Sequence, residues 1–395
     1  MLTRREAIGG LGAAAALMST SGLALAQQRA RKGARLRPGD TVGVIAPAGW
    51  PPNPADYDQA LQRVRDMGLV PRAGNHLRDR HGYLAGTDQN RAADVNAMFA
   101  DDNVKAVLAI RGGWGCARLL PYLDWGVIRA NPKILAGFSD ITALHLAIAA
   151  RGGFPTIHGP NIGSNWGSRS ADTFRRLVFD AALPVLEEWP GGIPPVAPPV
   201  QPVPSITVGP PPANVPPVPA PQSPAPRVGV DGQPLPSVTV DGEPVVSLPV
   251  SHRTRTIRGG KATGRLLGGN LTVLSALVGT PYLPDFDDAI LFLEDVEEAE
   301  YRVDRMLTQL ALAGILGRLN GIVFGQCTRC ATANPGPNSV SLDMVLNNHF
   351  SRFNIPSFTG AWFGHISNQL NIPVGVRAEI DADAGTIRVL EAAVA

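Results

Sequence analysis

The chain has 395 residues, of which 44% are hydrophobic and 17% are charged, and its formal net charge is +2. This length and apolar content are sufficient for two folded domains, each with a sizeable core. The near balance of charges excludes the broad basic surface of proteins that bind nucleic acid, so we expect no nucleic-acid partner.

The first 26 residues have the pattern of an export signal. They contain the adjacent Arg4 and Arg5, a short stretch rich in Ala, Gly and Leu, and the small-residue ending Ala24-Leu25-Ala26. This pattern is typical of the twin-arginine route. The apolar stretch is short and weakly hydrophobic, which favours cleavage after Ala26 over a retained membrane anchor. We therefore expect a periplasmic mature protein with no stable membrane anchor.

Residues 36–188 alternate short apolar runs with segments of helical periodicity. This alternation predicts an N-terminal α/β domain with a mostly parallel, flavodoxin-like sheet and flanking helices. The predicted strands contain "TVGVIAPAG", "LVPRAG", "VKAVLAIRGG" and "PKILAGF". One helix should span 88–100, and another should begin with Asn53 as N-cap and Pro54 as its first residue. Three side chains of that second helix fall on one face, which we expect to be buried: Tyr57, Leu61 and Val64.

Residues 189–255 have a different composition. Of the 37 prolines in the chain, 20 lie between residues 190 and 250. Proline-rich backbone lacks N–H donors and favours extended conformations, which predicts a linker or surface insertion. Asp-Gly turn signals at 231–232 and 241–242 favour a small hairpin within it, and a docking site for a partner is the alternative.

Residues 256–395 predict a second α/β lobe with a mixed sheet. Apolar runs in "AILFLEDV" and "NGIVFGQC" read as strands, and helical patterns occur in 301–316 and 342–350. The final segment "VRAEIDADAGTIRVLE" has two alternating stretches around an Asp-Ala-Gly turn, as in a terminal hairpin. We therefore expect two lobes joined by a long crossing.

The three cysteines are too few for a disulfide framework, so the core must hold this chain together. Cys327 and Cys330 could form a redox pair or half of a zinc site. No second Cys pair and no suitably spaced His pair accompanies them. We interpret them as ordinary cysteines at the end of a strand, with an incidental disulfide, and expect no metal and no cofactor.

Ser139 lies between two apolar segments of different period. Residues 134–138 read as a buried strand, whereas Ile141, Leu144, His145 and Ile148 have helical spacing. A tight strand-to-helix turn is where a nucleophile elbow places its serine, with helix N–H groups facing a developing oxyanion. Gly137 would remove a side chain from this crowded turn. Because Ile141 stands where the usual elbow has Gly, a plain helix N-cap at Ser139 or Asp140 is the alternative.

A nucleophilic serine needs a base. Among the seven histidines, His365 follows an apolar strand-like run and opens a loop, where catalytic residues concentrate. His145 lies on a helix face and is expected to be a core histidine. Gly112 and Gly113 follow another strand and would let backbone N–H groups approach a ligand, with a purely structural turn as the alternative.

The base needs an orienting acid, and Glu294 and Asp295 end the strand in "LFLEDV". The residues alone do not choose between them. Successive strand residues point to opposite faces, so we expect only one of these carboxylates to reach the cleft. Three further acidic residues are interpreted as a solvated cluster at the start of a helix: Glu297, Glu298 and Glu300.

Six segments, in the same order and at compatible separations, resemble the LD-carboxypeptidase family of serine peptidases. The resemblance covers nearly all of residues 38–392 except the proline-rich insertion. The segments are "VIAPAG", "AIRGGWGCARLLPYLD", "PKILAGFSDITAL", "GGNLTVL", "LFLEDVEEAEYRVDRML" and "GHISNQLNIPVG".

The resemblance implies that Ser139 is the nucleophile, Glu294 the acid and His365 the base. It implies an oxyanion hole formed by the backbone N–H groups of Gly113 and Asp140. It further implies three residues that contact the substrate: Gly112, Trp114 and Asn270.

The activity implied by the resemblance is hydrolysis of the amide bond to a terminal D-amino acid, typically D-alanine of a murein tetrapeptide, through an acyl-enzyme. A murein peptide is therefore the expected partner, and we allow for a homodimer. Related microcin-immunity hydrolases cut peptide-nucleotide conjugates, which is one alternative activity. A periplasmic binding protein for wall peptides, with the fold but without catalysis, is the other.

Overall fold

The computed structural model describes residues 31–187, 238–240, 243–245, 254–330 and 340–395. The chain divides into two units, Met1–Glu188 together with Arg253–Ala395, and Trp189–His252. The predicted export signal lies outside the described residues. None of the helices in the described ranges has both the length and the apolar character needed to cross a membrane.

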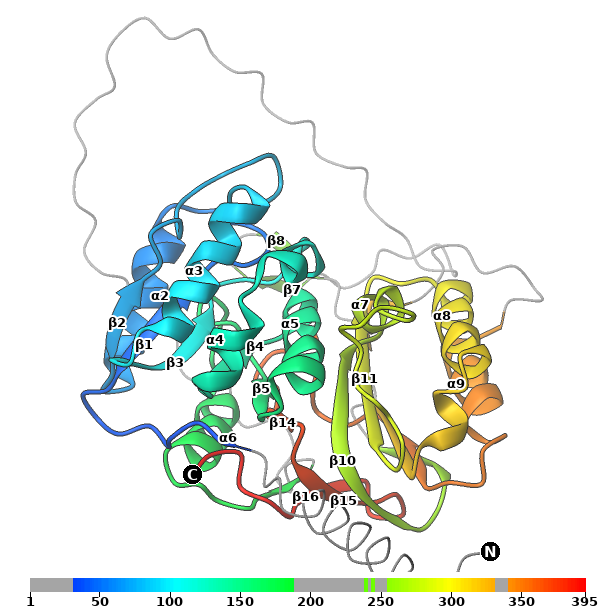
Figure 1. The fold of residues 1–395 in the computed structure, drawn as a ribbon. Coiled ribbons are helices and arrows are strands. Elements are labelled where there is room, and N and C mark those ends of the chain that lie inside the picture. The colour runs from blue at the N-terminus through cyan, green and yellow to red at the C-terminus, as the bar shows by residue number, and fades with distance from the viewer. Residues whose placement is uncertain (1–30, 188–237, 241–242, 246–253, 331–339) are drawn as a thin grey trace, which may run out of the picture. The chain divides into compact units, whose positions relative to one another are not determined.

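The first sheet of the larger unit has six strands in the order β14-β5-β4-β3-β1-β2 (Figure 1). Strands β2, β1, β3, β4 and β5 run parallel to one another, whereas β14 runs antiparallel to β5. The order 2-1-3-4-5 is that of flavodoxin-like sheets, so the predicted fold class of this lobe is confirmed. The strands are β1 (Thr41–Ile45), β2 (Val70–Ala73), β3 (Val104–Ala109), β4 (Ile134–Gly137), β5 (Thr156–His158) and β14 (Ile372–Val374).

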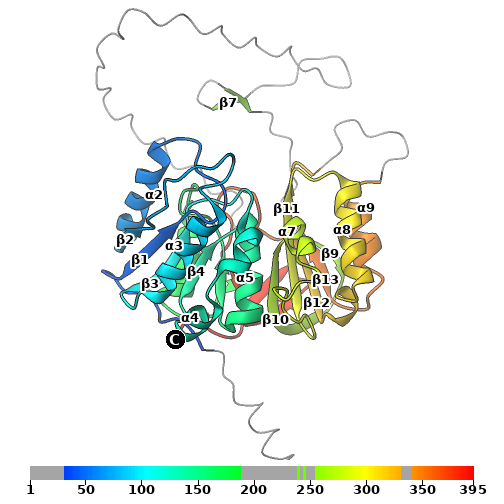
Figure 2. The same cartoon turned by 45° about the horizontal axis from the view of Figure 1, so that its top comes forward.

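Helices flank this sheet, and three of them, α3, α4 and α5, lie along one of its faces (Figure 2). Helix α3 covers the predicted range and is capped by Thr87, whose hydroxyl accepts a hydrogen bond from the Asn90 N–H at 3.2 Å. The helices are α2 (Ala55–Asp66), α3 (Asp88–Ala100), α4 (Trp125–Ala130), α5 (Thr142–Ala147) and α6 (Ser168–Val178).

The predicted start of helix α2 was one residue too early. Pro54 is the N-cap and the helix begins at Ala55. Asn53 does not cap it; instead, its N–H donates to the carboxylate of Asp56 in the first turn at 3.1 Å. A side chain of the first turn thus holds the backbone that precedes the helix, as the Glu of a capping box does. The predicted buried face is correct for Tyr57 and Val64, and Leu61 is half-buried.

The second sheet has eight strands in the order β6-β16-β15-β10-β11-β12-β13-β9. Strands β10 to β13 run parallel, and β15 and β16 form the predicted antiparallel terminal hairpin. The strands are β6 (Val185–Leu186), β9 (Arg255–Arg258), β10 (Lys261–Asn270), β11 (Ile290–Val296), β12 (Gly321–Thr328), β13 (Ser357–Thr359), β15 (Arg377–Asp381) and β16 (Thr386–Val389). The helices of this lobe are α7 (Leu271–Ala276), α8 (Glu300–Leu312) and α9 (Leu342–Phe350).

The two lobes exchange strands. Strand β6, from the N-terminal half of the chain, pairs with β16 in the second sheet. Strand β14, from the C-terminal half, pairs with β5 in the first sheet (Figure 1). Buried apolar side chains from both lobes form one continuous core. The boundary between the lobes is therefore crossed twice by paired backbone.

In the smaller unit, strands β7 (Val238–Val240) and β8 (Glu243–Val245) pair antiparallel. They lie on either side of the second Asp-Gly signal, so the hairpin predicted there is confirmed. The first Asp-Gly signal and the proline-rich stretch proposed as a docking site lie outside the described residues.

Candidate active site

Ser139 occupies the strand-to-helix turn that the sequence predicts. Its φ of 65° lies in the left-handed region, which is uncommon for a residue other than glycine and is a feature of strained functional turns. A short 3₁₀ turn, Ser139–Ile141, leads into α5. A side chain at Gly137 would meet Asn161 Oδ1 at 2.8 Å and Ala109 Cβ at 3.0 Å, so this turn is as crowded as expected. The predicted helix face, Ile141, Leu144, His145 and Ile148, is buried.

His365 lies between Ser139 and Glu294. Its Nε2 is 2.9 Å from Ser139 Oγ, and its Nδ1 is 2.7 Å from Glu294 Oε2. Ser139 follows β4 of the first sheet, Glu294 lies near the end of β11 in the second, and His365 lies in the loop after β13. The structure thus brings together three residues that are far apart in sequence. Their order of contacts is that of a nucleophile, a base and an orienting acid.

The environment of His365 sets its proton affinity. Burial lowers the pKa of His365, but the charge and hydrogen bond of Glu294 outweigh this and raise the pKa above the ordinary 6.5. The Glu294 side chain is fully buried, and its Oε1 has no hydrogen-bond partner among the described residues. Glu294 is therefore placed to stabilise an imidazolium and to fix the ring with Nε2 toward Ser139.

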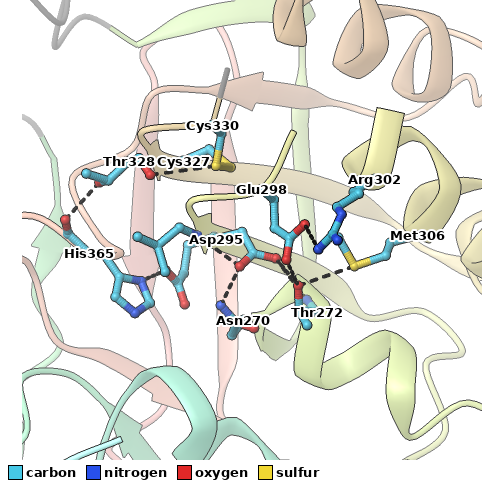
Figure 3. Close-up of a disulfide and its surroundings, with 12 residues drawn as sticks. Asn270, Thr272, Asp295, Glu298, Arg302, Met306, Cys327, Thr328, Cys330 and His365 are labelled. Atoms are coloured by element: carbon cyan, nitrogen blue, oxygen red, sulfur yellow. Dashed lines mark hydrogen bonds and ion pairs between the residues drawn. A yellow bond between two sulfur atoms is a disulfide. The ribbon is translucent and has the colours of Figure 1, made fainter. Parts of the chain in front are cut away.

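The backbone of His365 is held by a turn that contains a disulfide (Figure 3). Thr328 Oγ1 donates to the His365 carbonyl at 2.8 Å, and Cys327 and Cys330 form a disulfide on either side of Thr328. Glu297 N–H donates to the Thr328 carbonyl at 2.9 Å, which links the turn to the segment after β11. No cluster of three metal-ligating side chains occurs in the part of the chain that the structure describes.

A cavity of about 250 Å³ opens beside Ser139. One side is formed by the loop after β3, and the other by α7, the end of β11 and the segment that follows it. Its lining includes four of the residues expected in the oxyanion hole or in substrate contacts, and also Thr272, which had no such expectation. The four are Gly113, Trp114, Asp140 and Asn270. Residues from both lobes therefore surround the hydroxyl of Ser139.

Of the two neighbouring carboxylates in β11, Asp295 lines this cavity and Glu294 does not. Only one of the two carboxylates thus reaches the cleft, as expected, but it is not the one that contacts the base: Glu294 is fully buried behind His365. Asp295 accepts hydrogen bonds from Asn270 Nδ2 at 2.9 Å and from the N–H and hydroxyl of Thr272 at 2.9 and 2.8 Å (Figure 3). Burial and the nearby charge of Glu294 raise its pKa to about 6.

The acidic cluster at the start of α8 is only partly solvated. Glu297 is 65% exposed and pairs with Arg329, as a surface residue does. Glu298 is only 15% exposed and lines the cavity, so its interpretation as a solvated helix-start residue was wrong. Between them the backbone turns at Glu297, whose φ of 58° lies in the left-handed region.

The residues expected to bind the substrate occupy different places. Gly112 lies directly beside the nucleophile: a side chain there would meet Ser139 Cβ at 2.9 Å. Trp114 lines the cavity, is 55% exposed and packs edge-on against Tyr83 with ring centroids 5.8 Å apart. Asn270 caps α7 through a hydrogen bond accepted from Val273 N–H at 3.1 Å. The structure places these three residues around Ser139.

Two other histidines are buried near the site. His145 is the predicted core histidine, with Nδ1 2.8 Å from Thr156 Oγ1 and Nε2 2.9 Å from the Gly137 carbonyl, and burial lowers its pKa to about 4. His158 is fully buried between aromatic rings, and burial lowers its pKa well below 6.5. Burial therefore lowers the pKa of both histidines, whereas the pKa of His365 is raised.

No sequence pattern pointed to the supporting contacts made by Thr328 and Thr272. Thr328 follows Cys327 directly, and Thr272 lies two residues after Asn270, so both are close to residues that the motifs already mark. A strand end followed by Thr is too common to single out, so only the spatial arrangement identifies these two.

Residues 42–159 match the LD-carboxypeptidase N-terminal domain, and residues 263–380 match the LD-carboxypeptidase C-terminal domain. The Bacillus subtilis (strain 168) protein named "Probable murein peptide carboxypeptidase" is 33% identical over 364 residues, which cover 91% of this chain and 94% of that protein. The murein tetrapeptide carboxypeptidase of Pseudomonas aeruginosa is 29% identical over 350 residues, 87% of this chain and 93% of that protein.

Among solved structures, the microcin C7 self-immunity protein MccF in complex with glutamyl sulfamoyl guanosine has a TM-score of 0.71. It is 22% identical, and the match covers 92% of this chain and 99% of that chain. At this identity the likeness shows that the two proteins share a fold.

Proposed function

Because the chain belongs to the LD-carboxypeptidase family and is a serine carboxypeptidase, we propose that it removes the terminal D-alanine from murein tetrapeptides by hydrolysing the L,D-amide bond. The observation that carries this proposal is the position of His365, with Nδ1 at 2.7 Å from Glu294 and Nε2 at 2.9 Å from Ser139. The names of the two carboxypeptidase relatives support the substrate class.

In the first half of the reaction, His365 Nε2 accepts the proton of the Ser139 hydroxyl while Oγ attacks the carbonyl carbon of the scissile amide. The carbonyl π electrons move to oxygen, and the oxyanion is stabilised by the N–H groups of Gly113 and Asp140. His365 then donates its proton to the amide nitrogen, the C–N bond breaks, and D-alanine leaves from the acyl-enzyme.

In the second half, His365 accepts a proton from water, and the hydroxide adds to the acyl carbon. Collapse of the second tetrahedral intermediate breaks the bond to Ser139 Oγ, which recovers its proton from His365. Glu294 stays ionised throughout and stabilises the imidazolium of each step. The shortened peptide is released with a new carboxylate.

The proposal is tested by incubating the mature protein with purified murein tetrapeptide and following the products by mass spectrometry. We expect tripeptide and D-alanine in equal amounts, and neither product from Ser139→Ala. Tetrapeptide that binds but stays intact would overturn the proposal and favour a binding protein. Equal cleavage by Ser139→Ala would overturn the assignment of the nucleophile.

A peptide-nucleotide conjugate is the second candidate substrate. The exposed ring of Trp114 on the cavity wall favours it, because an exposed aromatic face can stack on a nucleobase. The fold shared with the microcin self-immunity protein agrees with this candidate. The two candidate substrates are separated by incubating wild type and Trp114→Ala with an aminoacyl sulfamoyl nucleoside and with murein tetrapeptide. If Trp114→Ala loses cleavage of the nucleoside conjugate but keeps cleavage of the tetrapeptide, the Trp114 ring is assigned to binding the nucleobase.

We also propose that the mature protein acts in the periplasm, where it would meet wall peptides directly. The twin-arginine leader supports this location.

A further inference from the structure

The peptide group between Gly115 and Cys116 is held at both ends by buried charged side chains. At one end the Cys116 N–H donates to Asp140 Oδ2 at 2.7 Å. At the other end the Gly115 carbonyl accepts from Arg91 Nη1 at 3.1 Å. Asp140 is 6% exposed and Arg91 is 1% exposed. A single peptide unit thus receives two charge-assisted hydrogen bonds in an interior where such bonds are strong.

Arg91 connects three loops at one edge of the first sheet. Besides Gly115 it donates to the carbonyls of Pro47 and Gly86, at 2.5 and 3.2 Å, and it forms an ion pair with Asp88. Pro47 follows β1 and Gly115 follows β3, so the guanidinium spans two neighbouring strand ends. Its planar fork of five N–H donors suits this task, whereas a lysine ammonium could not reach all of these carbonyls.

Asp140 connects the same loop to the nucleophile turn. Its backbone directly follows Ser139, and its carboxylate extends to Cys116. Burial raises the pKa of Asp140, and this rise is opposed by the Cys116 N–H, the Cys116 thiol and the charge of Arg91. The carboxylate therefore has compensating partners on the loop.

These contacts bear on the oxyanion hole. Gly113 lies two residues before the clamped peptide, in a segment with glycine at 112, 113 and 115. Glycine loses more conformational freedom on ordering than any other residue, so such a segment does not hold an N–H group in place by itself. Oxyanion donors contribute fully only when they are already positioned before the reaction.

We propose that Arg91 and Asp140 are positioning residues that fix the loop 112–116 against the nucleophile turn and so set the spacing of the two oxyanion donors. The inference rests on the proposed function, because it concerns the oxyanion hole of that reaction. It adds a role for the Asp140 side chain that is separate from the role of its backbone N–H.

Three variants test this pair. Asp140→Ala should lower kcat by about 10²-fold, the lower end of the cost of losing one oxyanion donor, with a much smaller change in KM. Asp140→Asn keeps an oxygen acceptor for the Cys116 N–H and should recover most of that loss. Arg91→Lys should lower kcat by a similar factor to Asp140→Ala, because lysine lacks the guanidinium donors that bind the three carbonyls.

The matched control is Asp94→Ala. Asp94 is also a buried carboxylate, 4% exposed, on the same helix as Arg91, but it accepts its hydrogen bond from the His76 N–H at 3.0 Å. We expect this variant to lower the melting temperature and to leave kcat of the folded enzyme within about twofold. The comparison separates loss of position from loss of stability.

Two readouts distinguish the failure of this inference from that of the proposed function. One is tetrapeptide turnover, and the other is the rate at which a fluorophosphonate labels Ser139. The labelling rate reports on the oxyanion hole because the phosphonyl oxygen of the adduct takes the oxyanion position. Near-normal turnover and labelling of Asp140→Ala, with active wild type, would overturn only the positioning role. If wild type is labelled at Ser139 but does not cleave tetrapeptide, the proposed substrate is overturned. The labelling rates of Asp140→Ala and wild type would then decide the positioning role. Wild type that neither cleaves nor is labelled would overturn both.

Discussion

Glu294 and Asp295 are consecutive residues of β11, and their carboxylates serve opposite sides of the site: Glu294 Oε2 lies 2.7 Å from His365 Nδ1, and Asp295 Oδ1 lies 2.9 Å from Asn270 Nδ2. The pairing of β11 with β12 is irregular at this point, because Leu293 pairs with Phe324 but Asp295 pairs with Cys327. Such an irregularity re-aims side chains next to active sites.

The first prediction separates these two carboxylates. Glu294→Gln should lower turnover of tetrapeptide by about 10⁴-fold, as the comparable change does in a Ser-His-Asp triad, because the charge opposite the imidazolium is lost. Asp295→Asn should lower turnover far less. It should instead lower the melting temperature, because an amide NH₂ would face the donors of Asn270 and Thr272. Steady-state kinetics and calorimetry measure the two effects, and the reverse pattern would make Asp295 the acid.

The second prediction concerns the pH dependence of kcat/KM. His365 acts as a base only when neutral, so activity is present above its pKa and is lost as the pH falls through it. Because Glu294 raises this pKa, the acid limb should have its midpoint above 6.5. In Glu294→Gln the charge that opposes the effect of burial is removed, so the midpoint should move to lower pH than in the wild type. A midpoint that is identical in both proteins would show that Glu294 does not act on His365.

The third prediction concerns the disulfide turn. Replacing Cys327 and Cys330 together by Ser should lower kcat by about tenfold, less than the ~10² that a 1 Å misplacement costs, because Thr328 would hold the His365 carbonyl less firmly. Thr328→Val removes the hydroxyl but keeps the disulfide and the side-chain shape. A similar loss in this variant would locate the effect in the hydrogen bond. Unchanged kcat in both would mean that the turn does not position His365.

The fourth prediction concerns the insertion. Deletion of residues 195–248 should leave the melting temperature and most of the activity unchanged, because a proline-rich segment buries little apolar area and loop length alters closure entropy slowly. The retained residues on either side serve as the linker. Thermal unfolding of both proteins is the measurement, and a large fall in melting temperature would show that the segment packs against the larger unit.

The fifth prediction concerns export. Replacing Arg4 and Arg5 by Lys should leave the precursor in the cytoplasm, because the twin-arginine receptor recognises those two side chains. Cell fractionation and immunoblotting with antibodies against the mature chain measure the distribution. An unchanged periplasmic yield would contradict the proposed route.

The elements that the sequence predicts well are those with strong local patterns. The strand-to-helix turn at Ser139, the helix 88–100 and the terminal hairpin all follow from periodicity and turn residues within about twenty positions. The pairing of β6 with β16 and the pairing of β14 with β5 could not be predicted in this manner. These strands are two and three residues long, and their partners lie about 200 residues away in the chain.

The candidate site shows the same division. Ser139, Glu294 and His365 lie in motifs, and the structure brings their side chains within hydrogen-bond distance. Which of Glu294 and Asp295 faces the cavity depends on how β11 packs between the lobes, which no local pattern reveals. The interaction of Arg91 with Gly115 was likewise hidden, since a buried arginine looks like a surface arginine in a sequence.

The contacts of Gly33 and Arg35 with Ala395 have a consequence for engineering. Arg35 N–H donates to the Ala395 carbonyl at 3.2 Å, and Ala395 N–H donates to the Gly33 carbonyl at 2.9 Å. A short peptide could therefore join Ala395 to Gly33, and new ends could be opened within Trp189–His252. The resulting circular permutant would begin at β9 and end at β6, and it would keep every strand pairing of both sheets. We therefore expect the same fold whether the part before Trp189–His252 or the part after it comes first in the chain.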